Sequence, residues 1–440
     1  MPGQGSSPVV PRRDREGARG HAAAQQTLPD LAMTAASASE ELPYIQRGTA
    51  AFRRTNLAFV CAGFATFALL YCAQPLLPAF AVAFQVSPAA SSLALSVPTA
   101  VMAFCMLVAS AVSEALGRKP VMVASVVVSS LLTVAAAFAP GWESFLVLRA
   151  LFGVALSGLP AVAMAFISEE VEPQSSGFAM GLYISGTALG GLSGRIIAGV
   201  LLDWGGWDWA VGGIGTLGVV SALIFWRSLP ASRHFRPRPL SWGGLAANFA
   251  MHLRDSGLRW LFLEGFLFMG SFVTIYNYIG FRLLAPPFSL AHSTVAMVFA
   301  VYLVGIGSST FIGGLADRFG RRRMLWATVL IMLAGLALTL PPSLPLIVLG
   351  MALLTFGFFG CHSLASSWVG RRALTAKAQA SSLYLFAYYM GASIVGVIGG
   401  LAWAWGRWAG VGALVGACLL LAFLVAALFL ARLQPVAPKN

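Results

Sequence analysis

A succession of long apolar runs constrains this chain more than any other feature. Crossing a hydrocarbon core of about 30 Å takes roughly 20 helical residues. Windows of about that length that are poor in charge lie near 57–84, 89–113, 119–139, 144–167, 177–202, 208–228, 258–282, 293–313, 323–341, 345–369, 379–402 and 409–431. Because lipid offers the backbone no hydrogen-bond partner, such runs must be helical. The sequence therefore predicts an all-α integral membrane protein with twelve transmembrane helices.

Composition supports a lipid environment. Hydrophobic residues make up 58% of the 440 residues and charged residues only 10%, which leaves too little polar surface for a soluble domain. A net charge of +13 also occurs in nucleic-acid-binding proteins, but here Lys and Arg lie at the ends of apolar runs. We therefore expect no nucleic-acid partner.

The basic residues also predict the orientation of the chain, because cytoplasmic loops carry an excess of Lys and Arg. With the N-terminus in the cytoplasm, all but four of the 28 Lys and Arg residues fall on the cytoplasmic side. The four exceptions are Arg149, Arg195, Arg282 and Arg407. Both termini are therefore predicted to be cytoplasmic.

Polar stretches divide the chain into segments. Residues 1–55 are rich in Ala, Ser, Gln, Gly and Arg and lack an apolar period, which predicts a disordered cytoplasmic tail. Residues 229–257, after the sixth window, are basic and interrupted by proline, which predicts a cytoplasmic linker. This leaves an N-terminal six-helix half at 56–228, a C-terminal six-helix half at 258–431 and a cytoplasmic tail at 432–440.

A short charged phrase occurs in each half. Residues 313–323 read GGLADRFGRRR, and residues 110–120 read SAVSEALGRKP. Both follow the second window of a half, which indicates an internal repeat. An acid at a helix end can pair with arginines and with the N-terminus of a neighbouring helix, and glycine permits a tight turn. Simple anchoring by positive charge explains the arginines but not the acid and the glycines, so we expect gating loops.

The second phrase resembles the loop signature of the major facilitator superfamily, G-x-x-x-D-R-x-G-R-[RK]. The matching positions are Gly313, Asp317, Arg318, Gly320, Arg321 and Arg322. The first copy departs from the signature in having Glu114 as its acid, and it keeps Gly117, Arg118 and Lys119. RALFGVALSG, from Arg149, and the glycine-rich GLYISGTALGGLSGR resemble two further phrases of that superfamily. The resemblance implies the major facilitator fold, in which two six-helix halves rock about a central site.

Longer phrases narrow the resemblance. YCAQPLLPAF, LPASRHFRP, EGFLFMGSFVTIYNYIGFRLL and QASSLYLFAYYMGASIVG are similar to the YnfM-type bacterial inner-membrane transporters, also called the acriflavine-sensitivity group. This implies an efflux-type secondary carrier in the bacterial inner membrane. Its expected partners are a small-molecule substrate, protons and the lipid bilayer, and we expect a monomer with no cofactor.

Polar side chains inside the spans are costly and are therefore candidates for function. The resemblance implies that the first, fourth, seventh and tenth spans line the central cavity. Counting along the helices predicts an outer layer that binds substrate, made of Arg149, Gln74, Asn277, Tyr276, Tyr278 and Arg195. The alternative for both arginines is a structural strut, and Gln74 has the alternative of satisfying a backbone kinked at Pro75.

A second layer lies nearer the cytoplasm. Glu264 is the one carboxylate well inside a span, and His362 is the one histidine at such depth. We expect the pair to couple transport to protons, because an apolar surrounding shifts a carboxyl group towards physiological titration. The alternatives are that Glu264 extends towards Arg259 at the cytoplasmic face and that His362 is a satisfied neutral side chain.

Other classes of membrane protein fit less well. A pump driven by ATP needs a G-x-x-x-x-G-K-[ST] loop, and the chain has no Gly-Lys pair. An enzyme or a metal site needs paired carboxylates, or His and Cys at ligand spacing, and the spans hold neither. We predict proton-coupled export of a small organic compound by alternating access. The compound is drug-like, sugar-like or an organic anion; an importer or facilitator of the same fold and, less favoured, a channel are the alternatives.

Overall fold

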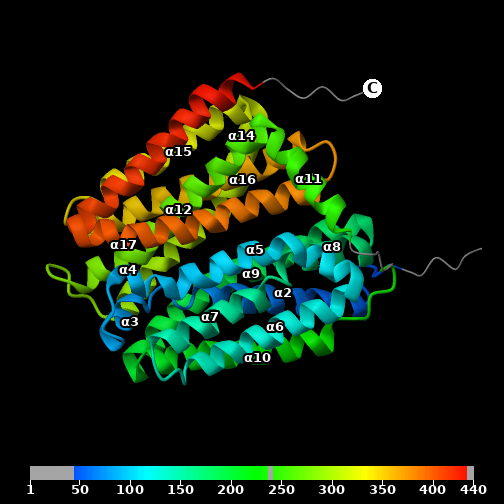
Figure 1. The fold of residues 1–440 in the computed structure, drawn as a ribbon, viewed down its shortest axis with the longest axis horizontal. Helices are drawn as coiled ribbons and strands as arrows, with labels where there is room; N and C mark the ends of the chain where they lie inside the picture. Colours follow the sequence, from blue (N-terminus) through cyan, green and yellow to red (C-terminus); the bar gives the residue numbers. More distant parts are fainter. Residues whose placement is uncertain (1–43, 236–240, 434–440) are drawn as a thin grey trace, which may run out of the picture. The chain divides into compact units, whose positions relative to one another are not determined.

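The computed structural model describes residues 44–235 and 241–433, which lie in one compact unit, Tyr44–Asn440. The predicted tail at 1–55 lies outside the described residues as far as residue 43, and the predicted tail at 432–440 does so from residue 434. The described chain is almost entirely helical, as the apolar windows predict (Figure 1).

The helices follow one another with short connections. In chain order they are α2 (Ala50–Tyr71), α3 (Leu77–Ala83), α4 (Pro88–Ser91), α5 (Leu93–Leu116), α6 (Arg118–Ala136), α7 (Trp142–Leu156), α8 (Pro160–Glu170), α9 (Pro173–Gly205), α10 (Trp207–Ser228), α11 (Trp242–Arg254), α12 (Ser256–Leu284), α13 (His292–Met297), η1 (Val298–Val301), α14 (Tyr302–Phe319), α15 (Arg321–Leu338), α16 (Leu344–Arg372), α17 (Lys377–Leu424), η2 (Val425–Phe429) and η3 (Leu430–Arg432). We refer to α2–α10 as the first half and to α12–η3 as the second half.

Local sequence explains where two of the predicted windows depart from single helices. The fourth window is divided between α7 and α8, and α8 begins at Pro160, which lacks an N–H group and is favoured in a first helical turn. The last two windows form one continuous element, α17, in which Gly406 and Arg407 have non-helical dihedral angles. α17 is therefore two helices joined at a kink.

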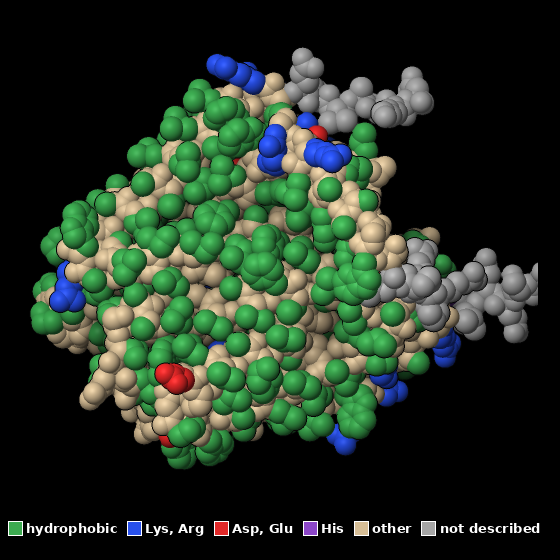
Figure 2. Space-filling model, viewed as in Figure 1, with side chains coloured by type: hydrophobic (Ala, Val, Ile, Leu, Met, Phe, Trp, Pro, Cys, Tyr) green, Lys and Arg blue, Asp and Glu red, His purple; other side chains and the backbone are tan. Residues whose placement is uncertain are grey.

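Eight helical segments of the described chain are long and apolar enough to cross a membrane. Large apolar side chains such as Val82, Phe138 and Trp405 are more than three-quarters exposed. Figure 2 shows hydrophobic side chains over most of the visible face, with Lys and Arg confined largely to its margins. Such a surface suits lipid and would be unfavourable in water.

The charged phrases adopt the same backbone conformation in both halves. Gly117 (φ 99°, ψ 145°) separates α5 from α6, and Gly320 (φ 87°, ψ 138°) separates α14 from α15. A positive φ of this size is open to glycine and strained for other residues. The internal repeat predicted from the two phrases is therefore present in the backbone.

Each phrase has a glycine followed by basic residues, and the second of these, Lys119 or Arg322, has an equivalent partner in both halves. Lys119 Nζ donates to the carbonyl of Leu229, just beyond α10, at 2.5 Å. Arg322 Nη1 donates to the carbonyl of Ala431, at the end of the last helix, at 3.0 Å. In both halves the loop therefore ties the start of the third helix to the end of the sixth, and these cations satisfy carbonyls that a helix end leaves free.

Glycines allow the same pairs of helices to approach closely in each half. A Cβ atom added at Gly190, on α9, would lie 2.1 Å from the carbonyl oxygen of Phe64 on α2. A Cβ atom added at Gly391, on α17, would lie 2.0 Å from the carbonyl oxygen of Phe266 on α12. Backbone contact of this kind is how small residues drive helix association in lipid.

The two halves meet where α9 ends and α13 begins, which we call the closed end. Asp203 accepts a hydrogen bond from the backbone N–H of Ser293 at 2.9 Å. A Cβ atom added at Gly400 would lie 2.3 Å from Cα of Ala89. We call the other end, where Gly117 and the second charged phrase lie, the basic end.

In Figure 1, α5 and α17 lie side by side at the boundary between the halves. Thr99 and Ser393 join these two helices through their hydroxyl groups, whose oxygen atoms are 2.7 Å apart.

Candidate functional site

The predicted outer layer contains a chain of hydrogen bonds that crosses between the halves. Gln74 lies in the turn after α2, and its Nε2 donates to Oδ1 of Asn277 on α12 at 2.8 Å. Nε of Arg195, on α9, donates to Oε1 of Gln74 at 2.8 Å. All three side chains are buried. The structure therefore brings together three of the six residues predicted to bind substrate.

Aromatic rings enclose the Arg195 guanidinium. Its carbon atom lies 4.2 Å from the ring centroid of Tyr71 and 4.4 Å from that of Tyr302, distances at which cation–π attraction is strong in a desolvated site. Nη2 donates to Tyr302 Oη at 3.0 Å, and Nη1 donates to the carbonyl of Gly191 at 2.5 Å. Every guanidinium nitrogen of Arg195 thus has a partner, and the Tyr302 partner belongs to the other half.

Arg149 lies apart from this chain and binds backbone carbonyls. Nε donates to Ala94 at 2.9 Å, and the two Nη atoms donate to Leu69 and Leu70 at 3.3 and 3.2 Å. Ala94 lacks its usual helical partner because the residue four positions on is Pro98, which has no N–H. In this conformation Arg149 therefore has the contacts of a strut, and its contact with substrate stays a prediction.

The two tyrosines of the layer have partners within the second half, whereas Asn277 has an unused donor. Tyr276 Oη lies 2.7 Å from Oγ1 of Thr355, and Tyr278 Oη donates to the carbonyl of Gly396 at 2.8 Å. Nδ2 of Asn277 is buried without a hydrogen-bond partner in the described chain. A buried donor in this state is costly, so the layer offers one group that a bound molecule can satisfy.

Glu264 lies on α12, just over three turns from Tyr276 towards the basic end. Its exposed fraction is 0%, and neither carboxylate oxygen has a hydrogen-bond partner among the described residues. It therefore does not reach Arg259, which was the structural alternative. An unpaired ionised carboxylate in apolar surroundings is strongly disfavoured, so the group requires a proton or a cation.

His362 and Glu264 do not hydrogen-bond to each other. Nδ1 of His362 lies 3.0 Å from Oη of Tyr384, and the ring centroids of His362 and Tyr388 are 4.7 Å apart. Tyr384 also packs on α12 beside Glu264, because a Cβ atom added at Gly265 would lie 2.7 Å from Cε2 of Tyr384. Tyr384 therefore links the neighbourhoods of both predicted proton-coupling residues.

Aromatic rings connect the second layer with the outer layer. From His362 the contacts run through Phe358, Phe272, Tyr276 and Tyr302, with successive centroid separations of 6.2, 3.8, 4.8 and 4.9 Å. We call these five rings the ring ladder. Ring pairs at such separations stabilise one another beyond the area they bury. The ladder ends at Tyr302, the tyrosine that binds Arg195.

In both charged phrases the acid pairs with an arginine one turn later. Asp317 is 74% exposed and lies 3.5 Å from Arg321, one turn later. Glu114 lies 3.7 Å from Arg118, which also binds Glu169, at the end of α8, at 2.8 Å. Within the described chain, Asp317 makes no contact with the N-terminus of a neighbouring helix in this conformation, so that part of the gating prediction is untested.

Sequence reasoning missed one ion pair at the basic end. Asp255 accepts hydrogen bonds from Nε and Nη2 of Arg372 at 2.6 and 3.0 Å, and from the backbone N–H of Leu258 at 2.7 Å. Burial tends to raise the pKa of Asp255, but these hydrogen bonds outweigh it and hold the pKa below its usual value. The sequence could indicate Asp255 as a helix cap, because an Asp directly before a helix is a cap signal. It could not indicate Arg372, at the end of α16, as the partner, because no local pattern relates two residues so far apart in the chain.

The described residues hold no group of three or more His, Cys, Asp and Glu side chains that is placed to bind a metal ion. All five cysteines are free.

Comparisons with known proteins agree on one family. The model of the Major Facilitator Superfamily matches residues 59–285 and 267–440. The uncharacterized MFS-type transporter YybF of Bacillus subtilis is 50% identical over 381 residues, covering 87% of this chain and 94% of its own. The inner membrane transport protein YnfM of Escherichia coli is 48% identical over 389 residues, covering 88% of this chain and 93% of its own.

Solved structures share the fold at low identity. A bacterial homologue of the human lysosomal transporter Spinster, in an inward-facing and unoccupied conformation, superposes with a TM-score of 0.73 at 17% identity. It covers 88% of this chain and 100% of its own. A D-xylose–proton symporter superposes with a TM-score of 0.65 at 16% identity, covering 86% of this chain and 97% of its own.

Proposed function

Because the chain belongs to the major facilitator superfamily, we propose that it is a secondary active transporter that exports a small organic compound in exchange for protons by alternating access. Its relatives are transporters, not enzymes, and it is a multi-pass protein of the cytoplasmic membrane. The proposal adds the coupling ion and the site, which are argued below, and the direction of transport, which the assay at the end of this subsection tests.

The observation that carries proton coupling is the state of Glu264. A carboxyl group that is fully buried with both oxygens unpartnered is stable when neutral and costly when ionised. If water from the cytoplasmic side reaches this site as the second half opens further, the cost of ionisation falls and the proton leaves to the cytoplasm, the direction that proton-driven export requires. Differential proton affinity between two conformations is what coupling requires. His362, held by Tyr384, is the proposed partner when the helices rearrange.

The proposed topology has twelve spans with both termini in the cytoplasm. α7 and α8 together form the fourth span, α13 to α14 form the eighth, and α17 supplies the last two on either side of the kink at Gly406 and Arg407. The basic end, with its loop arginines, then lies in the cytoplasm, as the positive-inside rule requires.

We further propose that the structure is the inward-facing conformation. The halves are joined at the closed end through Asp203 and Ser293. At the basic end, a Cβ atom added at Gly181 on α9 or at Gly313 on α14 would meet no atom within 4 Å. Small residues with open space around them suit surfaces that meet in the opposite conformation. The inward-facing state of the Spinster homologue, which shares the fold, is consistent with this assignment.

The proposed substrate site is the outer layer. Nδ2 of Asn277 supplies a free donor, and Gln74 and Arg195 lie at the boundary where the halves separate. Tyr276 and Tyr278 flank Asn277 on the same helix and give the site aromatic walls. Arg149 completes the layer by fixing the last turn of α2, directly before Gln74.

The proposed gate is formed by the two charged phrases. In the inward-facing conformation Asp317 is exposed and pairs only locally with Arg321. When the basic end closes, we propose that its carboxylate binds the N-terminus of a helix in the first half, where the helix dipole favours negative charge. This loop is shaped by Gly313, Arg318, Gly320 and Arg322. Its copy in the first half is shaped by Glu114, Gly117, Arg118 and Lys119.

The test of the proposal uses proteoliposomes with an imposed pH gradient. A substrate screen first identifies a transported compound, and Glu264→Gln is then compared with the unaltered protein. We expect the variant to lose accumulation of substrate against its gradient while it keeps exchange of labelled for unlabelled substrate, because Gln preserves shape and cannot release a proton. Glu143→Gln is the matched control, since Glu143 is an exposed carboxylate at the closed end.

Two results would contradict the proposal. Uphill accumulation by Glu264→Gln at the unaltered rate would show that Glu264 is structural. Flux without saturation or exchange would indicate a channel. The alternative direction is import, and it has the support that a proton symporter shares the fold. The same assay distinguishes import from export, because it shows which orientation of the pH gradient drives accumulation of the substrate.

A further inference from the structure

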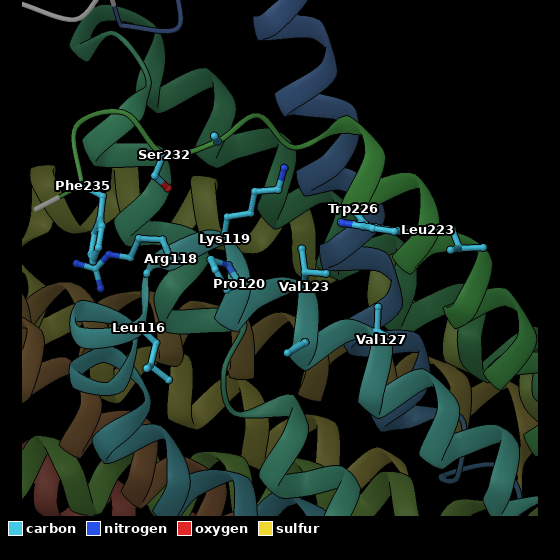
Figure 3. A pocket seen from close by; sticks show the side chains of 13 residues that line it. Leu116, Arg118, Lys119, Pro120, Val123, Val127, Leu223, Trp226, Ser232 and Phe235 are labelled. Atoms are coloured by element: carbon cyan, nitrogen blue, oxygen red, sulfur yellow. The ribbon is translucent and has the colours of Figure 1, made fainter. Parts of the chain in front are cut away.

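A pocket of about 820 Å³ opens at the basic end of the first half, on the side of the helices and away from the proposed substrate layer. Its walls are formed by α6, by α10 and by the segment that follows α10. Figure 3 shows Arg118 and Lys119 extending in opposite directions from the start of α6, with Val123 and Val127 on the turns below them.

The wall of the pocket is apolar and faces outwards. Val123 and Val127 lie one turn apart on α6, and Leu223 and Trp226 lie three residues apart on α10. Leu223 is 38% exposed and Trp226 is 52% exposed. An exposed apolar groove between two neighbouring antiparallel helices suits lipid and is unfavourable in water, and Trp is typical of the membrane–water interface.

The rim of the pocket is positively charged. Nζ of Lys119 uses one of its three donors on the carbonyl of Leu229. Arg54, at the start of α2, lies beside the pocket and not in its lining; it uses one of its five donors on the carbonyl of Arg227 at 3.0 Å, two residues before the carbonyl that Lys119 binds. Among the described residues, no carboxylate forms an ion pair with Lys119, Arg54 or Arg227, whereas the neighbouring Arg118 is paired with Glu114 and Glu169.

We propose that this pocket binds one anionic glycerophospholipid of the surrounding leaflet, with its phosphate at Lys119 and Arg54 and an acyl chain along Val127, Leu223 and Trp226. The unused donors at the rim match phosphate oxygens, and the groove matches an acyl chain that runs along the helices. The basic end lies in the cytoplasmic leaflet in the topology proposed above, and that leaflet attracts clustered Lys and Arg through its anionic lipids. The site is separate from the substrate layer, so its test does not depend on transport.

The test measures lipid retention by native mass spectrometry of the full chain, delipidated in detergent and titrated with phosphatidylglycerol or with phosphatidylcholine of the same acyl chains. We expect phosphatidylglycerol to be retained preferentially, and Lys119→Gln to lower its retention about fivefold. Val127→Trp, which fills the groove, should lower the retention of both lipids. Arg323→Gln is the matched control, because Arg323 is an exposed arginine of the other charged phrase, and it should retain phosphatidylglycerol normally.

Three outcomes would overturn the proposal. Equal retention of the two lipids by the unaltered protein would show that the charge of the lipid headgroup has no role. Equal retention of phosphatidylglycerol by Lys119→Gln and Arg323→Gln would show that the rim of this pocket has no role. Displacement of phosphatidylglycerol by an equal concentration of glycerol 3-phosphate would show a site for free phosphate instead of lipid. If Lys119→Gln is recovered only as aggregate, Arg54→Gln replaces it, with the same expected loss.

Discussion

Replacing Asn277 with alanine is expected to weaken the contact between the two halves. The substitution removes Oδ1, which accepts a hydrogen bond from Nε2 of Gln74 at 2.8 Å. Side-chain hydrogen bonds between helices in a membrane average about 0.6 kcal/mol and reach about 1.7 kcal/mol. The conformation with the closed end sealed should therefore lose population about 3-fold to about 17-fold relative to the open alternative. The upper figure is favoured, because the Gln74 donor stays buried without this acceptor.

The assay measures the distance between spin labels across the closed end. Phe138 and Trp405 are 81% and 84% exposed and lie on different halves at this end, so cysteines placed there in a background without the five native cysteines carry the labels. Double electron–electron resonance on the unaltered pair should give one short distance, and Asn277→Ala should add a longer one. Thr355→Val is the matched control, because it removes the hydroxyl bound to Tyr276 entirely within the second half.

The reasoning fails if Asn277→Ala leaves the distance distribution unchanged. It also fails if Thr355→Val lengthens the distance as much, because the effect would then come from general loosening of the second half and not from a bond between the halves.

Three further predictions concern the gate, the helix contacts and an ion pair. Asp317→Asn should slow transport in proteoliposomes with little change in melting temperature, because the exposed pair with Arg321 contributes less than about 1 kcal/mol; normal transport rates would contradict the gate. Gly391→Val should lower the melting temperature through a loss of about 1–3 kcal/mol or more, because its Cβ atom falls 2.0 Å from the carbonyl oxygen of Phe266; an unchanged melting temperature would refute this packing. Asp255 has a lowered pKa in the folded chain, so its contribution to stability is present above its unfolded pKa of about 3.9 and is lost as the pH falls through the lower folded value. Melting curves of the unaltered protein and Asp255→Asn should therefore differ at pH 7 and converge in acid, and a constant difference would argue against the assignment.

Sequence patterns predicted the helices well because lipid leaves the backbone few choices. Apolar windows located the helical segments, and Pro160 alone was enough to divide one of them. The repeat was visible in two charged phrases, and Gly117 and Gly320 have nearly the same dihedral angles. The number of spans stays a prediction, because the last two windows form one kinked helix, α17.

The candidate site was only partly accessible from sequence. Counting along helices gives the depth of a side chain, and depth placed Gln74, Asn277 and Arg195 in one layer, where the structure joins them. The direction in which a side chain points from its helix is set by the rotation and packing of whole helices, and no local sequence pattern records these. Glu264 and His362 share a depth and yet do not hydrogen-bond to each other; His362 hydrogen-bonds to Tyr384, which packs beside Glu264.

The ring ladder has a consequence for leakage. A carrier that is driven by a proton gradient, as proposed here, must not let protons leak between its two aqueous sides. Protons hop along chains of hydroxyls, imidazoles and water, and the ladder begins with such a group at His362 and ends with one at Tyr302. Between them stand Phe358 and Phe272, stacked with centroids 3.8 Å apart, and neither carries an atom that can accept or donate a proton. Along the ladder itself these two rings offer a proton no group to bind, while they keep the second layer and the outer layer in contact through packed rings.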